Sequence, residues 1–160
     1  MNPKQQTLDF SVNRYFGVHF NQEVWKMLEK PSITVEEGYK LIDLAHASNH
    51  HWRLSGTAIN QQRGAYLIAR VFLAVGSSDA AFIYAKRCWN FTQLNPTGIK
   101  DFDYAYAEEM MWKCELAEGN IEKANTHKEK ARSLGDAIES VEDKKIFDQD
   151  FETEYKNLMR

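Results

Sequence analysis

Three histidines and a tryptophan stand close together in the stretch AHASNHHW, residues 45–52, although the whole chain has only five histidines. At 100° of helical rotation per residue, Asp43, His46 and His50 share one stripe of a helix. His51 falls about 140° from His46 and lies outside that stripe. A carboxylate and two imidazoles so arranged suit Zn²⁺ or Fe²⁺ with positions open for water. One hypothesis is therefore a metal-dependent enzyme, although no HExxH motif supplies a general base.

The same stretch also fits the end of a helix that has no catalytic role. His46 falls at the edge of an apolar arc, where it would pack with one ring nitrogen hydrogen-bonded. His50 and His51 would then lie near the last carbonyl groups of the helix, whose partial negative charge favours imidazole. In this interpretation the stretch carries Trp52 into the core, and the protein binds no metal or other cofactor.

Two arginines interrupt an otherwise apolar segment that runs from about Thr57 to Val75. Arg63 and Arg70 are seven residues apart, so they lie about 20° from each other on a helix, with Asn60 nearby. An arginine withdrawn from water must be paired, because an unpaired charge there costs several kcal/mol. We therefore expect an anionic group to face these two guanidinium groups.

An internal partner for the arginines is available in the segment from about Asp101 to Glu118. Acidic residues recur there every seven positions, with two further acidic residues beside them: Asp101, Glu108 and Glu115, then Asp103 and Glu109. An ordinary network of ion pairs between two helices would neutralise both arginines. The alternative is an external anionic ligand, and sequence alone does not separate the two.

The elements that would position these groups are all helical. The three prolines, Pro3, Pro31 and Pro96, fall outside the periodic stretches, and no segment alternates apolar and polar side chains as a strand does. Capping signals support the helix ends, with Thr34 and Glu37 forming a capping box and Gly76, Gly119 and Gly135 following helices. We expect about seven antiparallel helices, at about 7–52 (two helices), 57–95 (two), 101–135 (two) and 139–158.

Composition narrows the class of protein. A chain of 160 residues fits one domain. The chain has 20 Lys and Arg and 23 Asp and Glu, and these charged residues form no run of like charge, so we do not expect nucleic acid as a partner. The cysteines, Cys88 and Cys114, have no CxxC companion, which favours a reducing compartment, the cytoplasm. No signal peptide or membrane span of about 18 apolar residues is present, and no membrane partner is expected.

A weak internal repeat relates two halves of the helical region. Placing Gly76 over Gly119 gives an offset of 43 residues, with an alanine at +5 (Ala81, Ala124) and a small residue at +12 (Cys88, Ala131). This spacing resembles the tetratricopeptide repeat, in which two helices joined by a tight turn pack through small residues. The stretches HASNHHW, NQQRGAYLIARVFLAVG and DFDYAYAE also resemble a group of uncharacterised bacterial helical-repeat proteins, which brings no assigned activity.

The copies depart from the tetratricopeptide pattern in two respects. Ala69 and Phe72 fit the first-helix positions of the first copy, but Trp112 and Glu115 stand there in the second. The period also exceeds the usual length of about 34 residues. The resemblance implies three helix pairs and a capping helix stacked in a right-handed superhelix; a compact helical bundle is the alternative.

The resemblance also implies a concave groove. The residues expected to line it are Asn60, Arg63, Tyr66, Arg70, Asp103, Tyr106, Glu109 and Lys113. Such a groove could grip a carboxylate of a peptide or of a small anionic ligand, so the leading hypothesis is a non-catalytic binding module whose partner is a protein or peptide segment. A homodimer whose interface is the groove or the first helix is a further alternative.

Overall fold

The computed structural model describes the backbone of residues 3–95 and 97–158, and the side chains of residue 6 and residues 9–95 and 97–152. Within these residues the regular structure is entirely helical, which confirms the expected fold class. Seven helices occur in the order α1 (Pro3–Leu28), α2 (Val35–Ser55), α3 (Ala58–Ala74), α4 (Ser78–Leu94), α5 (Asp101–Ala117), α6 (Ile121–Asp136) and α7 (Val141–Leu158).

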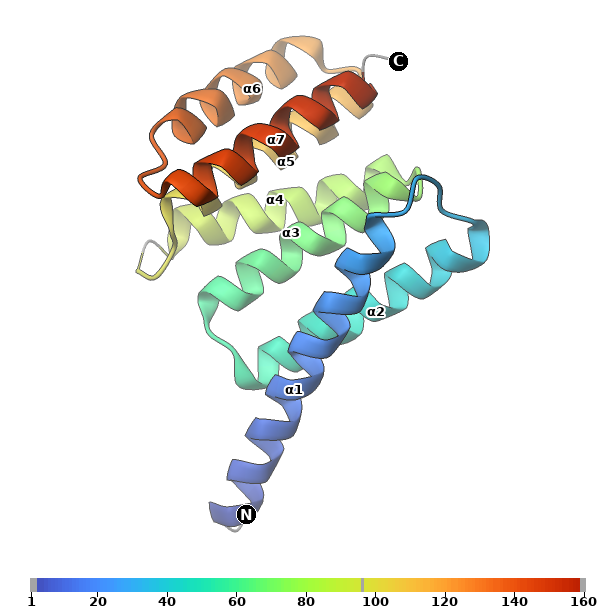
Figure 1. The fold of residues 1–160 in the computed structure, drawn as a ribbon, viewed down its shortest axis with the longest axis vertical. Coiled ribbons are helices and arrows are strands. Elements are labelled where there is room, and N and C mark those ends of the chain that lie inside the picture. The colour runs from blue at the N-terminus through green and yellow to red at the C-terminus, as the bar shows by residue number, and fades with distance from the viewer. Residues whose placement is uncertain (1–2, 96, 159–160) are drawn as a thin grey trace.

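The helices follow one another along the long axis of the molecule, from α1 at the bottom to α6 at the top (Figure 1). The most extensive packing lies within three pairs, α1 with α2, α3 with α4 and α5 with α6, and each pair contacts the next through α2 with α3 and α4 with α5. Contacts of α3 with α5 and of α5 with α7 place these odd-numbered helices in one layer, with α7 covering α5 (Figure 1). The handedness of a superhelix stays a prediction.

The two predicted turns of the repeat have the same geometry. Gly76 and Gly119 both have φ of +77°, a left-handed conformation that costs glycine little. The backbone N–H of the residue after each glycine donates a hydrogen bond to a carbonyl of the preceding helix. Ser77 N donates to Phe72 O and Asn120 N to Glu115 O, both at 2.8 Å. This is the Schellman ending, which satisfies carbonyl groups that the helix leaves unpaired. The 43-residue offset therefore relates two equivalent helical turns.

Several predicted boundaries differ from the structure. Pro3 begins α1 instead of preceding it, because the first turn of a helix needs no N–H from that residue. Helix α2 continues past Trp52 to Ser55. Pro96 and residues 1, 2, 159 and 160 of the predicted domain lie outside the described residues.

Gly135 was expected to end a helix, but it lies inside α6. A Cβ atom at this position would lie only 2.1 Å from Cε1 of Phe147, so the glycine allows α7 to pack closely against α6. A glycine needed for close approach and a glycine that ends a helix look the same in sequence, which explains the wrong prediction.

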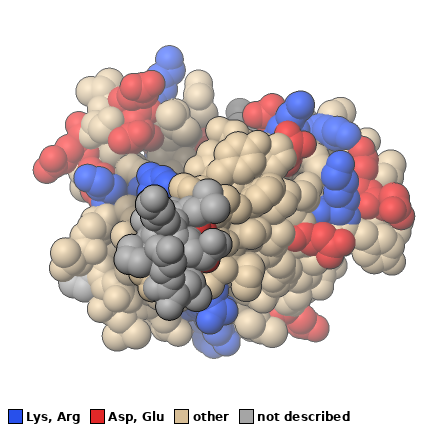
Figure 2. All heavy atoms as spheres, turned by 90° about the horizontal axis from the view of Figure 1, so that it is seen from below, with Lys and Arg blue, Asp and Glu red and all other residues tan. Residues whose placement is uncertain are grey.

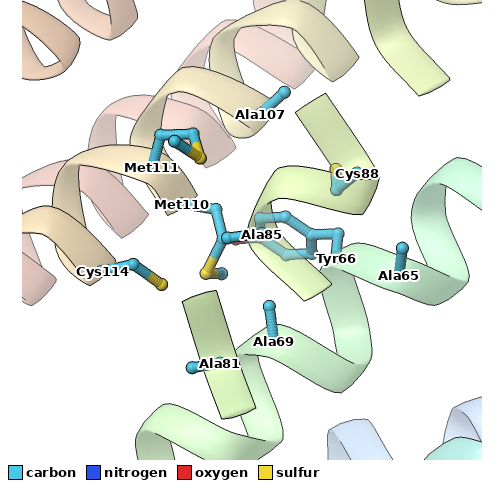
Figure 3. Close-up of a cluster of buried hydrophobic side chains, with 10 residues drawn as sticks. All are labelled: Ala65, Tyr66, Ala69, Ala81, Ala85, Cys88, Ala107, Met110, Met111 and Cys114. Atoms are coloured by element: carbon cyan, nitrogen blue, oxygen red, sulfur yellow. The ribbon is translucent and has the colours of Figure 1, made fainter. Parts of the chain in front are cut away.

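The core consists of three adjacent clusters of buried side chains instead of one centre. The first joins α1, α2 and α3, the second joins α3, α4 and α5, and the third joins α5, α6 and α7. The middle cluster is built around small residues such as Ala81, Ala85 and Cys88, which let α4 approach α3 and α5 (Figure 3). Partly buried rings of Phe72, Tyr84 and Tyr106 pack against two clusters each and so connect them.

Capping and cysteine placement agree with the sequence interpretation. Thr34 and Glu37 form the predicted capping box at the start of α2, with the Thr34 backbone N–H donating to Glu37 Oε2 at 2.9 Å. Hydrogen bonds from Lys30 and Thr34 lower the pKa of Glu37 to about 2. Cys88 and Cys114 are both buried free thiols. In the described part of the chain, no helix combines the length and the apolar character needed to cross a bilayer.

Candidate functional site

Two cavities open between the odd-numbered helices. The aromatic cavity, of about 380 Å³, lies among α1, α3, α5 and α7 and is lined by Asn21, Trp25, Gln62, Arg63, Tyr66, Phe102, Asp103, Tyr106, Ile146 and Asp150. The basic cavity, of about 460 Å³, lies towards the C-terminal ends of α1, α3 and α5 and is lined by Leu28, Arg70, Leu73, Ala74, Gly76, Ser78, Met110, Lys113 and Ala117. Together they form the groove.

Helical periodicity explains why the two cavities share helices. On α1 the lining residues Asn21, Trp25 and Leu28 are spaced by four and three positions, so they follow one face. Arg63 and Arg70 likewise lie two turns apart on α3, about 10 Å along the helix axis. Helices α1, α3 and α5 therefore contribute residues to the lining of both cavities.

Arg63 is paired within the protein. Its Nε donates to Asp103 Oδ1 at 2.8 Å and its Nη2 to Asp103 Oδ2 at 3.0 Å, a bidentate ion pair between α3 and α5. The Asp103 side chain is buried, whereas that of Arg63 remains 46% exposed and its guanidinium lies 4.9 Å from the centre of the Phe102 ring. Internal pairing was one expected outcome, but the partner is Asp103 instead of Asp101, Glu108 or Glu115.

These three other carboxylates have partners elsewhere. Glu108 accepts from Trp89 Nε1 at 3.0 Å and lies 2.5 Å from His127 Nδ1, which joins α4, α5 and α6. Asn120 Nδ2 donates to Glu115 at 2.8 Å, and the backbone N–H of Glu139 donates to Asp101 at 2.8 Å. The expected pairing of Arg63 with the acidic stripe of Asp101, Glu108 and Glu115 is therefore not found, since each of these carboxylates bonds to another partner.

A buried ion pair lies between the two cavities. Lys113 and Glu109, one turn apart on α5, contact each other with side chains only 3% and 0% exposed. The hydroxyl of Tyr66 donates to the other Glu109 oxygen at 3.1 Å. Burial, together with the charge of Glu109, raises the pKa of Tyr66 well above its usual value, so Tyr66 remains a neutral donor. Glu109 was expected to face the groove, but its side chain is fully buried and bonds to Tyr66 and Lys113, which line the two cavities.

Arg70 and Trp25 connect the cavities on the open side. The Arg70 guanidinium lies 5.5 Å from the centre of the Trp25 ring, within range of a cation–π interaction. Trp25 also stacks on Tyr66 with ring centres 6.5 Å apart. Trp25 is 37% exposed and forms part of the aromatic cavity.

Tyr106 and Asp150 form the wall of the aromatic cavity that faces α7. The Tyr106 hydroxyl donates to Asp150 Oδ2 at 2.7 Å. Burial and this hydrogen bond raise the pKa of Tyr106, so the phenol keeps its proton and continues to donate. The ring of Tyr106 meets that of Tyr66 edge to face at 5.5 Å, an attractive geometry for aromatic pairs.

Asn60 has no part in the groove. Its Oδ1 accepts from the backbone N–H of Thr57 at 3.0 Å, which caps the start of α3. The prediction that Asn60 faces a ligand is therefore wrong, because a side chain in the first turn is used to satisfy the helix end.

The histidines form no metal site. Among the described residues, no three His, Cys, Asp or Glu side chains gather in a way that could hold a metal ion, and this includes Asp43, His46 and His50. His46 packs edge-on against Tyr84 and Phe72 at 5.4 and 6.0 Å, and burial lowers its pKa. His50 is exposed.

His51, which falls outside the predicted stripe, is the histidine that bridges two helices. Its Nδ1 lies 2.7 Å from Asn13 Oδ1 on α1, and its ring packs against Phe16 and Phe20. AHASNHHW accordingly lies in the closing part of α2 and buries Trp52, as the non-catalytic interpretation predicts, whereas its contact with α1 was not predicted.

Several lining residues were missed at the sequence level. Gln62 and Phe102 are next to positions that were named, whereas Trp25 lies on the first helix and Asp150 on the helix expected only to cap the stack. A spacing of four residues back from Tyr66 on α3, and from Tyr106 on α5, would have pointed to Gln62 and Phe102. No sequence signal points to Trp25 or Asp150, because α1 and α7 reach the cavity only through the fold.

Comparison of the chain with protein-family models, with curated proteins and with solved structures found no match, so the groove is described from its own geometry.

Proposed function

We propose that this chain is a binding module without catalytic activity, whose groove holds a segment of a partner protein or a small anionic ligand. The groove itself carries this proposal: two adjoining cavities combine apolar walls with a few charged groups at their edges, which is the usual composition of ligand sites. The two free, buried cysteines fit a reducing compartment, and we place the module in the cytoplasm.

The basic cavity supports the anionic part of the proposal. Arg70 and Lys113 line it beside the apolar side chains of Leu28 and Leu73, and its described lining includes no carboxylate. The Glu109 carboxylate that pairs with Lys113 lies behind the wall, fully buried. A carboxylate entering this cavity would meet the Arg70 guanidinium beside hydrocarbon, the arrangement used to anchor acidic residues of peptides, whereas Lys113 is already paired with Glu109.

The groups available for covalent chemistry support a module that does not catalyse. Burial raises the pKa of Cys88 and raises that of Cys114 to about 12, so both thiols stay protonated at neutral pH. A protonated, buried thiol is a poor nucleophile.

A peptide array probed with three arginine variants tests this function. We expect Arg63→Ala and Arg70→Ala to lose most of the peptides that the parent retains, whereas Arg53→Ala, at an exposed position of α2 remote from both cavities, should retain them. Circular dichroism would establish that each variant keeps its helices. Unchanged binding by folded Arg63→Ala and Arg70→Ala would refute the groove as the binding surface.

Self-association through α1 is a second candidate. Among the described residues of this helix, five large apolar side chains are exposed, namely Phe10, Val12, Tyr15, Val18 and Trp25. On the face seen from below, charged side chains of both signs lie mainly around the margin, with uncharged side chains between them (Figure 2). Sedimentation at several protein concentrations would detect a dimer, and a monomer at every concentration would exclude it.

A further inference from the structure

The deepest polar group of the aromatic cavity is the side-chain amide of Gln62, which is only 1% exposed. Its Nε2 donates to Thr92 Oγ1 at 3.0 Å and approaches the backbone carbonyl of Asp103 at 3.4 Å. The hydroxyl proton of Thr92 is already directed to Cys88 O at 2.9 Å, so Thr92 accepts from Gln62 and the amide orientation is determined. The amide oxygen, Oε1, has no hydrogen-bond partner among the described residues.

A buried acceptor without a donor is costly, by about 1–3 kcal/mol, and in native proteins it calls for an explanation. Gln62 cannot exchange its two ends, because both Thr92 and the Asp103 carbonyl require a donor. A ligand that brings an N–H or O–H group into the cavity would satisfy Oε1. Because Gln62 lines the cavity, a ligand donor placed beside it would meet this unsatisfied acceptor.

Asp150 supplies the second polar group of the cavity. Its Oδ2 accepts from the Tyr106 hydroxyl, and within the described part of the chain it has no ion pair. Among the described residues of the lining, the other charged groups are Arg63 and Asp103, whose bidentate pairing cancels their charges. This described lining is thus left with the negative charge of Asp150. One positive charge on a ligand would balance it.

Aromatic rings form most of the remaining wall. Trp25, Tyr66 and Tyr106 line the cavity together with Phe102, whose ring is already covered by the Arg63 guanidinium. The faces of aromatic rings carry negative charge density, and tryptophan attracts cations most strongly. The Trp25 ring already has Arg70 at 5.5 Å, which demonstrates that a cation is accommodated beside it.

From these contacts we infer that the aromatic cavity binds a primary ammonium group, carried by a lysine side chain of a bound peptide or by a small free amine. The ammonium donates one N–H to Gln62 Oε1 and one to the Asp150 carboxylate, while its methylene groups lie against Trp25 and Tyr106. A quaternary ammonium has no N–H for Gln62, and a carboxylate would face Asp150. This inference rests on the proposed function, because it assumes that the groove receives a ligand.

Three immobilised peptide libraries with the same random flanks, and with lysine, norleucine or glutamate at the centre, test the inference on the full chain. We expect the lysine library to be retained at least about tenfold better than the norleucine library, since hydrogen bonds to a charged group contribute about 1.5–3 kcal/mol. Asp150→Asn keeps an acceptor for Tyr106 but removes the charge, and it should reduce retention about tenfold. Asp143→Asn, in the first turn of α7, is the matched control and should leave it unchanged.

Each outcome decides the inference. If free n-butylamine binds the protein directly and displaces the lysine peptides, with Asp150→Asn weakening both, the ammonium alone is recognised and a free amine is sufficient. If only peptides bind, lysine within a peptide is the ligand. Equal retention of the three libraries, or retention unaffected by Asp150→Asn, would overturn the inference while the groove variants still test the proposed function. If no library and no amine is bound, both fail.

Discussion

The two cavities lie on the same helices about 10 Å apart along α3, yet their charged groups are stabilised in opposite ways. In the aromatic cavity the bidentate pair joins buried Asp103 to half-exposed Arg63, and it crosses from α5 to α3. In the basic cavity both members of the Lys113–Glu109 pair are buried on α5. The first pair shapes a surface that solvent or a ligand can reach, whereas the second is part of the interior. The groove thus contains one ion pair that solvent or a ligand can contact and one ion pair that is enclosed in the interior.

Of the variants considered, the one that breaks the buried Lys113–Glu109 pair should lose the most free energy of unfolding. Lys113→Met leaves Glu109 charged and without its cation in the interior, so we expect a loss of about 3–5 kcal/mol in the free energy of unfolding. Urea denaturation measures this loss. The double variant Lys113→Met with Glu109→Gln should recover most of it, because the new amide still accepts from Tyr66. A loss below about 1 kcal/mol in the single variant would contradict the interior role of this pair.

Breaking the pair of the aromatic cavity should cost less. Asp103→Ala removes the two bonds from Arg63 and the bond that Asp103 Oδ2 accepts from the backbone N–H of Lys100 at the start of α5. We expect about 2 kcal/mol of destabilisation, because the arginine left behind remains hydrated. Glu118→Ala, at the exposed C-cap of α5, is the control for this helix. If Asp103→Ala cost as much as Lys113→Met, the two pairs would not differ in the way proposed.

Alkaline pH should weaken the aromatic cavity selectively. Burial, together with the hydrogen bond from Tyr106 to Asp150, raises the folded pKa of Tyr106 above its ordinary value of 10.0. The unfolded chain releases this proton first, so the stability that Tyr106 contributes is complete below about pH 10 and declines above it by about 1.4 kcal/mol per pH unit.

Comparison with Tyr106→Phe isolates this effect. Near neutral pH the variant should be less stable by about 1 kcal/mol, the value of a lost hydrogen bond, and the gap should close and then reverse as pH rises above about 10. Thermal unfolding of both proteins across this range gives the measurement. A gap that stays constant would mean that Tyr106 titrates alike in the folded and unfolded chains.

The smallest effect on stability should come from Trp25, which lines the aromatic cavity and contacts Arg70 of the basic cavity. Because its side chain is 37% exposed, Trp25→Leu should change the free energy of unfolding by less than about 1 kcal/mol. It should nevertheless weaken retention of lysine peptides about threefold, through loss of the cation–π wall. Trp112→Leu, at a buried tryptophan, is the contrast and should lower stability far more. Unchanged retention by Trp25→Leu would remove this ring from the site.

Local signals in the sequence predicted much of the fold. The left-handed glycines at 76 and 119 and the capping box of Thr34 and Glu37 are all found, because each depends on a few neighbouring residues. Gly135 was misinterpreted, since its role is contact with Phe147 across the fold. Helix ends are local properties of the chain, and close approaches between helices are not.

The candidate site was predicted only in part for a related reason. Arg63, Tyr66, Asp103 and Tyr106 line the aromatic cavity, and Arg70 and Lys113 line the basic one, but Asn60 and Glu109 face elsewhere. The choice between Asp101 and Asp103 as partner of Arg63 depends on how α5 is rotated about its axis. That rotation is determined by packing against α3, α4 and α6 together, which no periodicity within α5 reveals.

The lining of the aromatic cavity has a consequence for how the chain unfolds. Stacks of helix pairs are held by neighbour contacts, so their ends can open before the middle does. Trp25 near the end of the first helix and Asp150 on the last helix face the same cavity. A ligand bound in this cavity would therefore contact both the first and the last helix. The terminal helices would then unfold together with the rest of the chain in one cooperative transition instead of separately. Binding would be visible as a sharper melting curve as well as a higher midpoint.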